Sequence, residues 1–504
     1  MTPGEHTELA PGREWVGGAR PGDKRRRPRP GWLRPVLVAV PLVAMAAGLV
    51  FVVVTVVRIA NPPETAAEKA AKAARAAAAA RCAFPGCPAA ADAGIARAYE
   101  DPGIAVDPRN PSHVVVTDVN LQTGACTWHT TTNAGQDWTD GAFPVPSGFR
   151  GCGGLDSAGL LPAGGVAFGP SGTVYAVFSS AGGWDGVASR GALAQHESVL
   201  LAVSSDGGKA FTSHEAVKPP DPDPAYIRPT VTVAPGPGGR DEVLITTTEC
   251  KTDPTRATRA CIGARFARST DGGDTFAPSV DIAPQGGSSP GAAVVAPDGA
   301  IYTTIVRRFG DGSAEAVLER STDGGQTFAS ATLDLQPGLG AQYDPVKLAL
   351  DAKGAIYAAY ADAGKGSLQV VVRKSTDKGA TFSEPVVINA GLNGTTNNPQ
   401  ISVAPNGRVD VVFYRQPNPD TANAFWAYST DGGTTFVSRQ LNDKPIDRRA
   451  GYSAVLRSSG IDHYAPAIAS TNATAYAAWS DTRDATKDTE TQDVVFRRLE
   501  VNGS

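Results

Sequence analysis

Short apolar runs and turn residues alternate along most of the chain after residue 95. The commonest arrangement is an apolar run, a turn of Pro, Gly, Asn or Asp, and a second apolar run, which predicts a β-hairpin. A clear example is ISVAPNGRVDVVFY at 401–414. Seven hairpins are predicted, at 103–117, 165–178, 230–246, 292–306, 346–360, 401–414 and 467–479. The pattern therefore indicates one large all-β region.

A second pattern, S/T-x-D/N-x-G-x-x-F/W, follows six of the seven hairpins. The acidic side chain can accept backbone N–H groups within a tight turn, the glycine permits positive φ, and the aromatic ring can pack beneath the turn. The first copy is degenerate, with Asn133 and Trp138. The other five carry Asp206, Asp271, Asp323, Asp377 and Asp431. A turn that recurs predicts a structural role for these aspartates rather than a catalytic one.

The repeat has a period of mostly 52–65 residues, which leaves room for four strands per unit and is typical of a β-propeller. The turn resembles the Asp-box, or BNR repeat, of the sialidase (neuraminidase) superfamily, over roughly residues 95–500. The resemblance implies that each box joins the third and fourth strands of a blade. Seven hairpins predict seven blades, although sialidases resemble six-bladed propellers, so six blades is the alternative. The last unit is predicted to lack a fourth strand, which we expect Ala93–Tyr99 to supply.

In a propeller blade the first strand starts, and the second strand ends, at the same face. Residues at these positions should therefore surround one central opening. The alternative role for each is an ion pair between blades or packing at a rim. Before first strands lie Tyr226, Ile227, Arg228, Gln342, Tyr343, Asp344, Thr396, Asn397, Asn398, Asp462, His463 and Tyr464. After second strands lie Asp118, Asn120, Glu249, Arg307, Arg308, Asp362, Tyr414, Arg415, Ser480, Asp481, Thr482 and Arg483.

The resemblance to sialidases implies a tyrosine nucleophile activated by a glutamate, an aspartate acid/base, and an arginine cluster that binds the substrate carboxylate. The matching candidates are Tyr414, Glu249, Asp344 or Asp362, and the arginines Arg228, Arg307 and Arg415. Further substrate-binding candidates are Tyr343, Asn398, His463, Tyr464, Asp481 and Arg483. No cofactor or metal is expected. A non-catalytic propeller that binds a glycan, a peptide or a cell-envelope protein is the alternative function.

The formal net charge is -4, but it is unevenly distributed. Residues 1–60 contain nine Lys/Arg and four Asp/Glu, about +5, so the remainder carries about -9. An acidic body of this kind disfavours nucleic acid as a partner, because phosphate binding needs clustered positive charge.

Val36–Val57 contains 22 residues without a charge, enough to span a hydrocarbon core of about 30 Å. The basic segment DKRRRPRPGWLR precedes it. We therefore expect a single-pass anchor in the cell membrane, with the N-terminus in the cytoplasm and the body outside it. A cleaved signal peptide is the alternative. The expected organisation is a disordered basic tail (1–33), a transmembrane anchor (34–58), a helical Ala-rich stalk with a Cys82/Cys87 turn (59–91), and the propeller (92–504).

Six cysteines occur, all after residue 81, and an even number suits disulfides in an extracytoplasmic body. Their order suggests the pairs Cys82–Cys87, Cys126–Cys152 and Cys250–Cys261. Free buried thiols are the alternative. A cysteine metal site is not expected, because no CxxC spacing is present.

Overall fold

In the computed structural model, the described part of the chain is all-β. The described residues are 99–120, 125–149, 165–181, 197–220, 224–253, 258–284, 286–287, 289–309, 314–336, 345–362, 368–450, 465–483, 485 and 492–501. The chain divides into two compact units, Met1–Lys69 and Ala70–Ser504, and every described residue belongs to the second. The one helical element among these residues is the short 3₁₀ helix η2 (Pro237–Gly239).

The predicted tail, anchor, stalk and Cys82/Cys87 turn fall outside the described residues. Of the helices that the structure does describe, none has the length and apolar character needed to cross a membrane.

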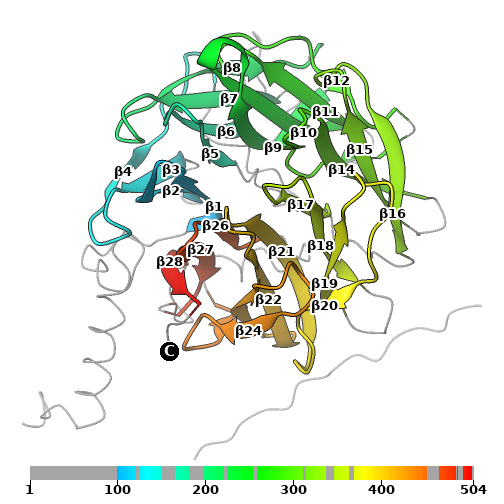
Figure 1. Cartoon of the computed structure of the whole chain (residues 1–504). Helices are drawn as coiled ribbons and strands as arrows, with labels where there is room; N and C mark the ends of the chain where they lie inside the picture. The colour runs from blue at the N-terminus through cyan, green and yellow to red at the C-terminus, as the bar shows by residue number, and fades with distance from the viewer. Residues whose placement is uncertain are drawn as a thin grey trace, which may run out of the picture. The chain divides into compact units, whose positions relative to one another are not determined.

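Strands in the described residues form antiparallel meanders that follow one another along the chain (Figure 1). We number these meanders 1 to 7. Meander 1 contains β1 (Tyr99–Asp107), β2 (Asn110–Asn120), β3 (Ala125–Thr131) and β4 (Thr139–Ala142). Meander 2 contains β5 (Val166–Phe168), β6 (Val174–Ala181), β7 (Glu197–Ser204) and β8 (Thr212–Val217). Meander 3 contains β9 (Pro224–Pro235), β10 (Asp241–Asp253), β11 (Thr258–Ser269) and β12 (Val280–Asp281). β7 and β9 also pair in parallel, at Glu197 and Ala225, so meanders 2 and 3 form one eight-stranded sheet.

The remaining meanders have the same order of pairing. Meander 4 contains β13 (Val294–Val295), β14 (Ile301–Arg308), β15 (Ala314–Ser321) and β16 (Ala329–Gln336). Meander 5 contains β17 (Lys347–Leu350), β18 (Ile356–Asp362), β19 (Gln369–Ser375) and β20 (Val386–Val387). Meander 6 contains β21 (Thr395–Val403), β22 (Val409–Asn418), β23 (Thr421–Ser429) and β24 (Val437–Gln440), and β25 (Ile446–Asp447) also pairs with β23. Meander 7 contains β26 (Ala467–Ser470), β27 (Thr474–Asp481) and β28 (Asp493–Glu500).

All seven predicted hairpins are present, as the first two strands of each meander. The strands form because β-branched and aromatic residues alternate in direction along them. Val114 and Val116 of β2 pack against Tyr476 of meander 7, whereas Val115 and Val119 pack towards meander 2. Each meander therefore has two apolar faces and must be covered on both sides by its neighbours.

Hydrogen bonds between neighbouring meanders reinforce this packing. The Thr246 hydroxyl donates to the Gly291 carbonyl oxygen at 2.8 Å, and the Thr304 hydroxyl donates to the Val346 carbonyl oxygen at 2.6 Å. The last meander is joined to the first, because β1 contacts β26 and β27 and the Tyr476 hydroxyl donates to the Pro111 carbonyl oxygen at 2.8 Å. Successive meanders that contact in chain order and close on the first define a β-propeller-like fold.

The expected closing strand is not found where it was placed. Tyr99 belongs to β1 and pairs with Asn120 of β2, so the prediction that Ala93–Tyr99 forms the outer strand of the last unit is wrong for Tyr99. The rest of that segment lies outside the described residues, in which meander 7 has three strands. Tyr99 instead extends the first hairpin, in which β1 pairs with β2.

Each of the six repeated turns joins the third and fourth strands of its meander. In the third copy the Ser269 hydroxyl donates to Asp271 Oδ1 at 2.6 Å, and Asp271 Oδ1 also accepts the Thr275 N–H at 3.0 Å. The Gly273 N–H donates to the Ser269 hydroxyl, with Gly273 at φ +90°. These hydrogen bonds, led by that from Ser269, lower the pKa of Asp271 to about 2. Asn133 takes the place of the aspartate in meander 1 and accepts the N–H groups of the same turn.

Candidate ligand-binding site

The two ends of the meanders differ in chemistry. The repeated turns and the turns between first and second strands lie at one end, because strands alternate in direction within each meander. At the other end, first strands start and second strands finish. We call this the mouth end.

Tyr414 of β22 lies at the mouth end and is 7% exposed. Its hydroxyl accepts a hydrogen bond from the Ser480 N–H at 3.1 Å and donates to the Ser480 carbonyl oxygen at 3.4 Å. The ring therefore lies between meanders 6 and 7, and both hydrogen-bonding directions of the hydroxyl are used by the neighbouring backbone.

Glu249, the residue expected to activate Tyr414, lies in β10 of meander 3. Its carboxylate pairs with Arg265 of β11, with Nε and Oε2 2.5 Å apart, and the side chain is 8% exposed. Tyr414 and Glu249 thus occupy separate meanders, and their contacts are made with different neighbours.

The three arginines expected to bind a carboxylate differ in their surroundings. Arg307 of β14 lies 3.5 Å from Glu315 and 3.7 Å from Glu319, both in β15 of the same meander. Arg415 of β22 donates through Nε to the Asn393 carbonyl oxygen at 2.6 Å. Arg228 lies near the start of β9. The contacts of Arg307 and Arg415 are therefore made inside two different meanders.

The remaining candidates are placed as follows. Asp481 and Arg483, at the end of β27, pair with each other at 2.5 Å, and the Trp479 indole N–H donates to the same carboxylate at 3.1 Å. Asp362 ends β18, and Asn398 lies buried in β21. Those outside the described residues are Tyr343, Asp344, His463 and Tyr464.

A second repeat, which the sequence interpretation did not use, shapes the start of the first strands. Arg228, Ser289 and Asn398 each precede a proline and have φ of +52°, +55° and +53°. Left-handed backbone is uncommon for residues other than glycine, and here it produces a bulge: the pairing of β9 and of β21 shifts register at these residues. An X-Pro step also lies within the first strand of meander 1, at Pro102, and before the other first strands, at Pro162, Pro345 and Pro466. This recurrence was the sequence signal available for the bulges.

Asn397, directly before one of these bulges, has an unusual amide. The residue is 1% exposed, yet neither Nδ2 nor Oδ1 has a hydrogen-bond partner. Among the described residues, Asn442 is a buried amide that is paired: its Oδ1 accepts the Ala424 N–H at 2.9 Å, and its Nδ2 donates to Asn423 Oδ1 at 3.1 Å. A buried polar group without a partner requires an explanation, because leaving it so costs stability.

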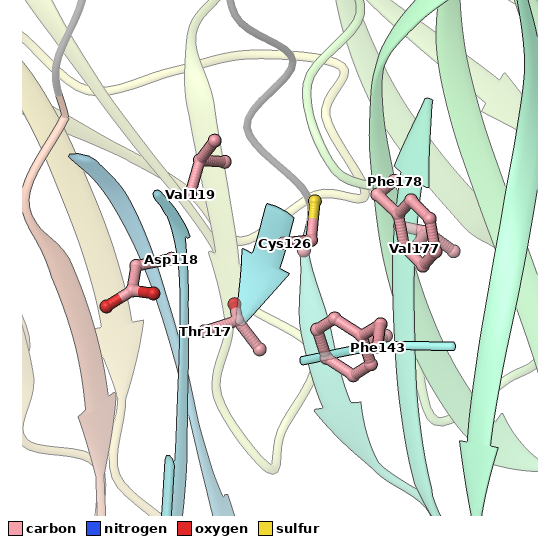
Figure 2. Close-up of a pocket in the computed structure, with 9 residues that line it drawn as sticks. Thr117, Asp118, Val119, Cys126, Phe143, Val177 and Phe178 are labelled. Carbon is pink, nitrogen blue, oxygen red and sulfur yellow. The ribbon is translucent and has the colours of Figure 1, made fainter. Parts of the chain in front are cut away.

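Two of the cavities in the structure are lined by described residues at known places in the fold. One, of about 10 Å³, lies between meanders 1 and 2 and is lined in part by Val119, Cys126, Phe143 and Phe178 (Figure 2). That volume is roughly one water molecule. Figure 2 shows the Asp118 carboxylate directed away from the two phenylalanines, and Asp118 instead pairs with His129 at 3.2 Å.

The other cavity, of about 480 Å³, lies at the end of the repeated turns, opposite the mouth end. It is lined by Asn406, Arg408, Thr430, Asn472, Ala473, Glu500 and Val501. Arg408 is 4% exposed, and its guanidinium donates to Asp410 and to the carbonyl oxygens of Thr471 and Asn472. The Arg408 guanidinium is therefore already hydrogen-bonded to groups of the protein.

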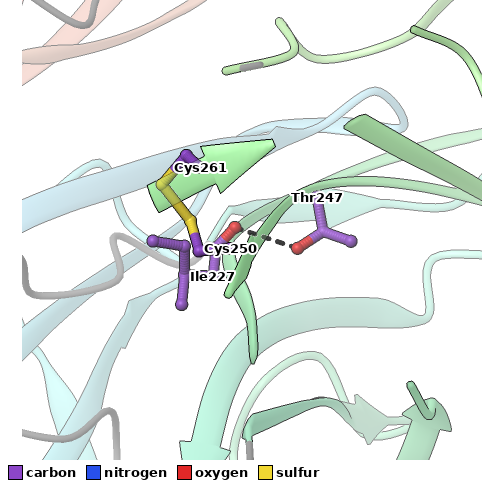
Figure 3. The surroundings of a disulfide bond; sticks show 4 residues. All are labelled: Ile227, Thr247, Cys250 and Cys261. Carbon is purple, nitrogen blue, oxygen red and sulfur yellow. Dashed lines mark hydrogen bonds between the residues drawn. A yellow bond between two sulfur atoms is a disulfide. The ribbon is translucent and has the colours of Figure 1, made fainter. Parts of the chain in front are cut away.

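A disulfide joins Cys250 of β10 to Cys261 of β11 across the mouth end of meander 3, as predicted (Figure 3). Beside it, Ile227 packs on Cys250, and the Thr247 hydroxyl donates to the Ile227 carbonyl oxygen at 2.9 Å. These contacts fix the backbone that leads into the Arg228 bulge. Cys126 is also disulfide-bonded, and its predicted partner Cys152 lies outside the described residues.

Known proteins resemble the chain only distantly. No family model and no curated protein matches it. Among solved structures, a protein of unknown function from Dyadobacter fermentans is 16% identical, with 68% of this chain and 94% of that chain covered and a TM-score of 0.47. A Hadza microbial sialidase is 15% identical (77% and 76% covered, TM-score 0.43), and an ulvan lyase of polysaccharide lyase family PL25 is 13% identical (80% and 94%, TM-score 0.47). Similarity at this level assigns no activity, and the fold described above rests on the chain's own strand pairing.

Proposed function

We propose that the chain is a membrane-anchored, extracytoplasmic propeller of seven Asp-box blades whose mouth end binds a carboxylate-bearing glycan. The observation that supports this proposal is the hydrogen bonding of the Arg415 guanidinium. Only its Nε has a hydrogen-bond partner among the described residues, the Asn393 carbonyl oxygen, and no described carboxylate pairs with it. Arg307 and Arg483 at the same end are paired with Glu or Asp. The two Nη atoms of Arg415 are the edge that suits a bidentate carboxylate.

The residues around Arg415 favour a hydroxyl-rich ligand. Side-chain amides gather at this end of meander 6, and amides offer both a donor and an acceptor to a sugar hydroxyl. They belong to Asn393, Asn397, Asn398, Gln416 and Asn418. The side-chain oxygens of Gln416 and Asn418 already accept hydrogen bonds, from Arg448 and from the Asp420 and Thr421 N–H groups, so Asn393 and Asn397 are the amides proposed to contact the ligand. One available cation beside two such amides matches an acidic sugar better than an apolar peptide segment.

The contacts of Tyr414 and Glu249 favour binding over hydrolysis. A tyrosine nucleophile needs a free hydroxyl next to its activating carboxylate. Here the hydroxyl of Tyr414 is hydrogen-bonded to Ser480 and the carboxylate of Glu249 to Arg265. We therefore propose a binding protein rather than a retaining glycosidase.

The anchor and the outward orientation rest on Val36–Val57 and on the basic residues that precede it. The Cys250–Cys261 disulfide agrees with an oxidising compartment. Seven blades are supported by the seven successive meanders, of which meanders 2 and 3 share one eight-stranded sheet, and the Asp-box type by the hydrogen bonds of the Asp271 turn.

Binding of matched glycosides by the purified full chain tests the proposal. A glucuronoside and a glucoside have the same ring hydroxyls and differ only in the carboxylate. We expect the glucuronoside to bind about tenfold or more tightly, and Arg415→Ala to abolish this difference. Arg373→Ala is the matched control, because Arg373 donates to the Leu333 carbonyl oxygen in β16 and to the Ser383 carbonyl oxygen between β19 and β20, so its loss should leave the preference intact. Equal affinities for both glycosides would refute the carboxylate site, and turnover of a fluorogenic sialoside would refute the non-catalytic assignment.

A further inference from the structure

We infer that Asn397 is a ligand-binding residue whose amide binds an uncharged group of the glycan, a ring hydroxyl pair or an acetamido group, at the inner edge of meander 6. This inference rests on the proposed function and deepens it. It adds a specificity-determining position that the carboxylate contact does not require.

The first argument is the unpaired amide. Asn397 is 1% exposed, and both amide atoms lack partners although the surrounding chain is closely packed. The amide has two N–H donors and one carbonyl acceptor, so it loses several hydrogen bonds to water on folding. A leucine or valine at this position would avoid that loss. Several single hydroxyl groups are also buried without a partner, but in Asn397 both the donor and the acceptor of one side chain are, which points to a partner that the folded chain does not supply.

The second argument is the backbone next to it. Asn398 has φ of +53°, a left-handed conformation that non-glycine residues seldom adopt. The strand pairing passes from Asn397–Tyr414 directly to Gln400–Val412, so two residues of β21 oppose one residue of β22. The same conformation occurs at Arg228 and Ser289, so it is a repeated feature of the fold. This copy differs because the residue directly before it, Asn397, carries a buried amide without a hydrogen-bond partner, at the point where the bulge interrupts regular pairing.

The third argument is how the side chains near Asn397 are arranged on the two faces of meander 6. Asn397 and Tyr414 are cross-strand partners, so their side chains lie on the same face of meander 6, and Tyr414 reaches Ser480 of meander 7. The hydrogen bonds to Ser480 hold the tyrosine ring in place beside the amide. On the other face, Thr396 is the cross-strand partner of Arg415. β21 is the edge strand of its sheet, and the Thr396 N–H on that edge donates to the Leu368 carbonyl oxygen at 3.0 Å, so a ligand that reaches Arg415 on one face and Asn397 on the other must approach beside that contact.

The amide is closed off from solvent in this structure, so binding must open the site. We therefore expect association to be slower than for a ligand that enters a preformed cleft.

The test compares Asn397→Leu with Asn389→Leu in the full chain. Asn389 is also buried, but its Oδ1 accepts the Val370 N–H at 2.9 Å. Leucine at 389 leaves that N–H unpaired and should lower Tm by about 1–3 °C. Leucine at 397 removes two unpaired groups and should leave Tm unchanged or higher. Binding of the glucuronoside, the glucoside and an N-acetylneuraminic acid glycoside is then measured for both variants and for the wild-type chain.

We expect Asn397→Leu to weaken binding of at least one probe about tenfold, with Asn389→Leu binding like the wild-type chain wherever it is folded. If Asn397→Leu binds all three probes with wild-type affinity, or if the wild-type chain binds none of them, the inference is overturned. If the wild-type chain binds the glucoside as tightly as the glucuronoside and Asn397→Leu loses both, the inference stands while the carboxylate site fails. Retained preference in Asn397→Leu with weaker affinity overall supports both.

Discussion

The buried pair of Arg408 and Asp410 offers the sharpest test of how meanders 6 and 7 are held together. Arg408 is 4% exposed and Asp410 is fully buried. Arg408 Nε lies 3.0 and 2.9 Å from the two carboxylate oxygens. The same carboxylate accepts the Trp426 indole N–H at 3.0 Å and the Ser470 hydroxyl at 2.8 Å. Ser470 belongs to meander 7, so the carboxylate links two sheets.

Arg408→Met should be strongly destabilising. It leaves a buried carboxylate without its cation and removes the hydrogen bonds to the Thr471 and Asn472 carbonyl oxygens. Breaking a buried pair in this way costs about 3–5 kcal/mol. For the unit Ala70–Ser504, an unfolding entropy of about 2.1 cal/mol/K per residue converts this to a fall in Tm of about 3–5 °C.

The double variant R408M/D410N separates charge from packing. Asparagine keeps an acceptor for Trp426 but carries no charge, so the double variant should be more stable than Arg408→Met alone, by about 1–3 kcal/mol. Burial raises the pKa of Asp410, with the charge of Arg408 acting in the opposite direction. The penalty in Arg408→Met should therefore shrink as the pH falls and the carboxyl group gains a proton.

Urea unfolding of the full chain, followed by tryptophan fluorescence, gives these values, since Trp426 is 2% exposed and should report the transition. A loss of less than about 1 kcal/mol in Arg408→Met, or equal stability of the single and double variants, would show that the pair is solvated and would refute the reasoning.

Three further predictions concern the turns, the disulfide and the tyrosine. The pKa of Asp271 is lowered to about 2, so its contribution to stability is complete above the unfolded value of about 3.9 and is lost as the pH falls towards 2; Asp271→Ala should flatten the acid limb of a Tm–pH profile, and an unchanged limb would contradict this. Replacing Cys250 and Cys261 by serine should cost about 2–4 kcal/mol in urea unfolding, whereas an effect under 1 kcal/mol would argue against a structural disulfide. Tyr414→Phe removes the hydrogen bonds to Ser480, so it should cost about 0.5–1.5 kcal/mol and leave glycan affinity within about twofold; a large loss of affinity with unchanged stability would instead return Tyr414 to the binding machinery.

Much of the fold could be predicted from local pattern. Period-two alternation and Pro/Gly/Asn/Asp turns located all seven hairpins, because a two-strand unit is encoded by residues close in sequence. The turn of Asp271 could be predicted equally well, since Ser269, Asp271, Gly273 and Thr275 lie within seven residues and hydrogen-bond to one another. The disulfide between Cys250 and Cys261 followed from sequence order within one hairpin.

The candidate site was harder to predict from the sequence than the fold. The order of strands placed Tyr414, Arg415 and Glu249 at one end of their meanders, but it did not give the direction of their side chains. Glu249 faces Arg265 across a strand pair, and Tyr414 reaches the backbone of the next meander. Both outcomes depend on strand register and on neighbours far apart in sequence, which a motif does not encode.

Asn397 is a second residue whose role could not be predicted from the sequence. Its position before a first strand was evident, yet its importance lies in the absence of a partner, which only the packed structure reveals. The sequence by itself determined the all-β class, the seven hairpins and the repeated aspartate turns, because each is decided by interactions within about ten residues. Only the tertiary structure decided which arginine keeps an open edge and which buried amide lacks a hydrogen bond, because those properties depend on every strand that packs around them.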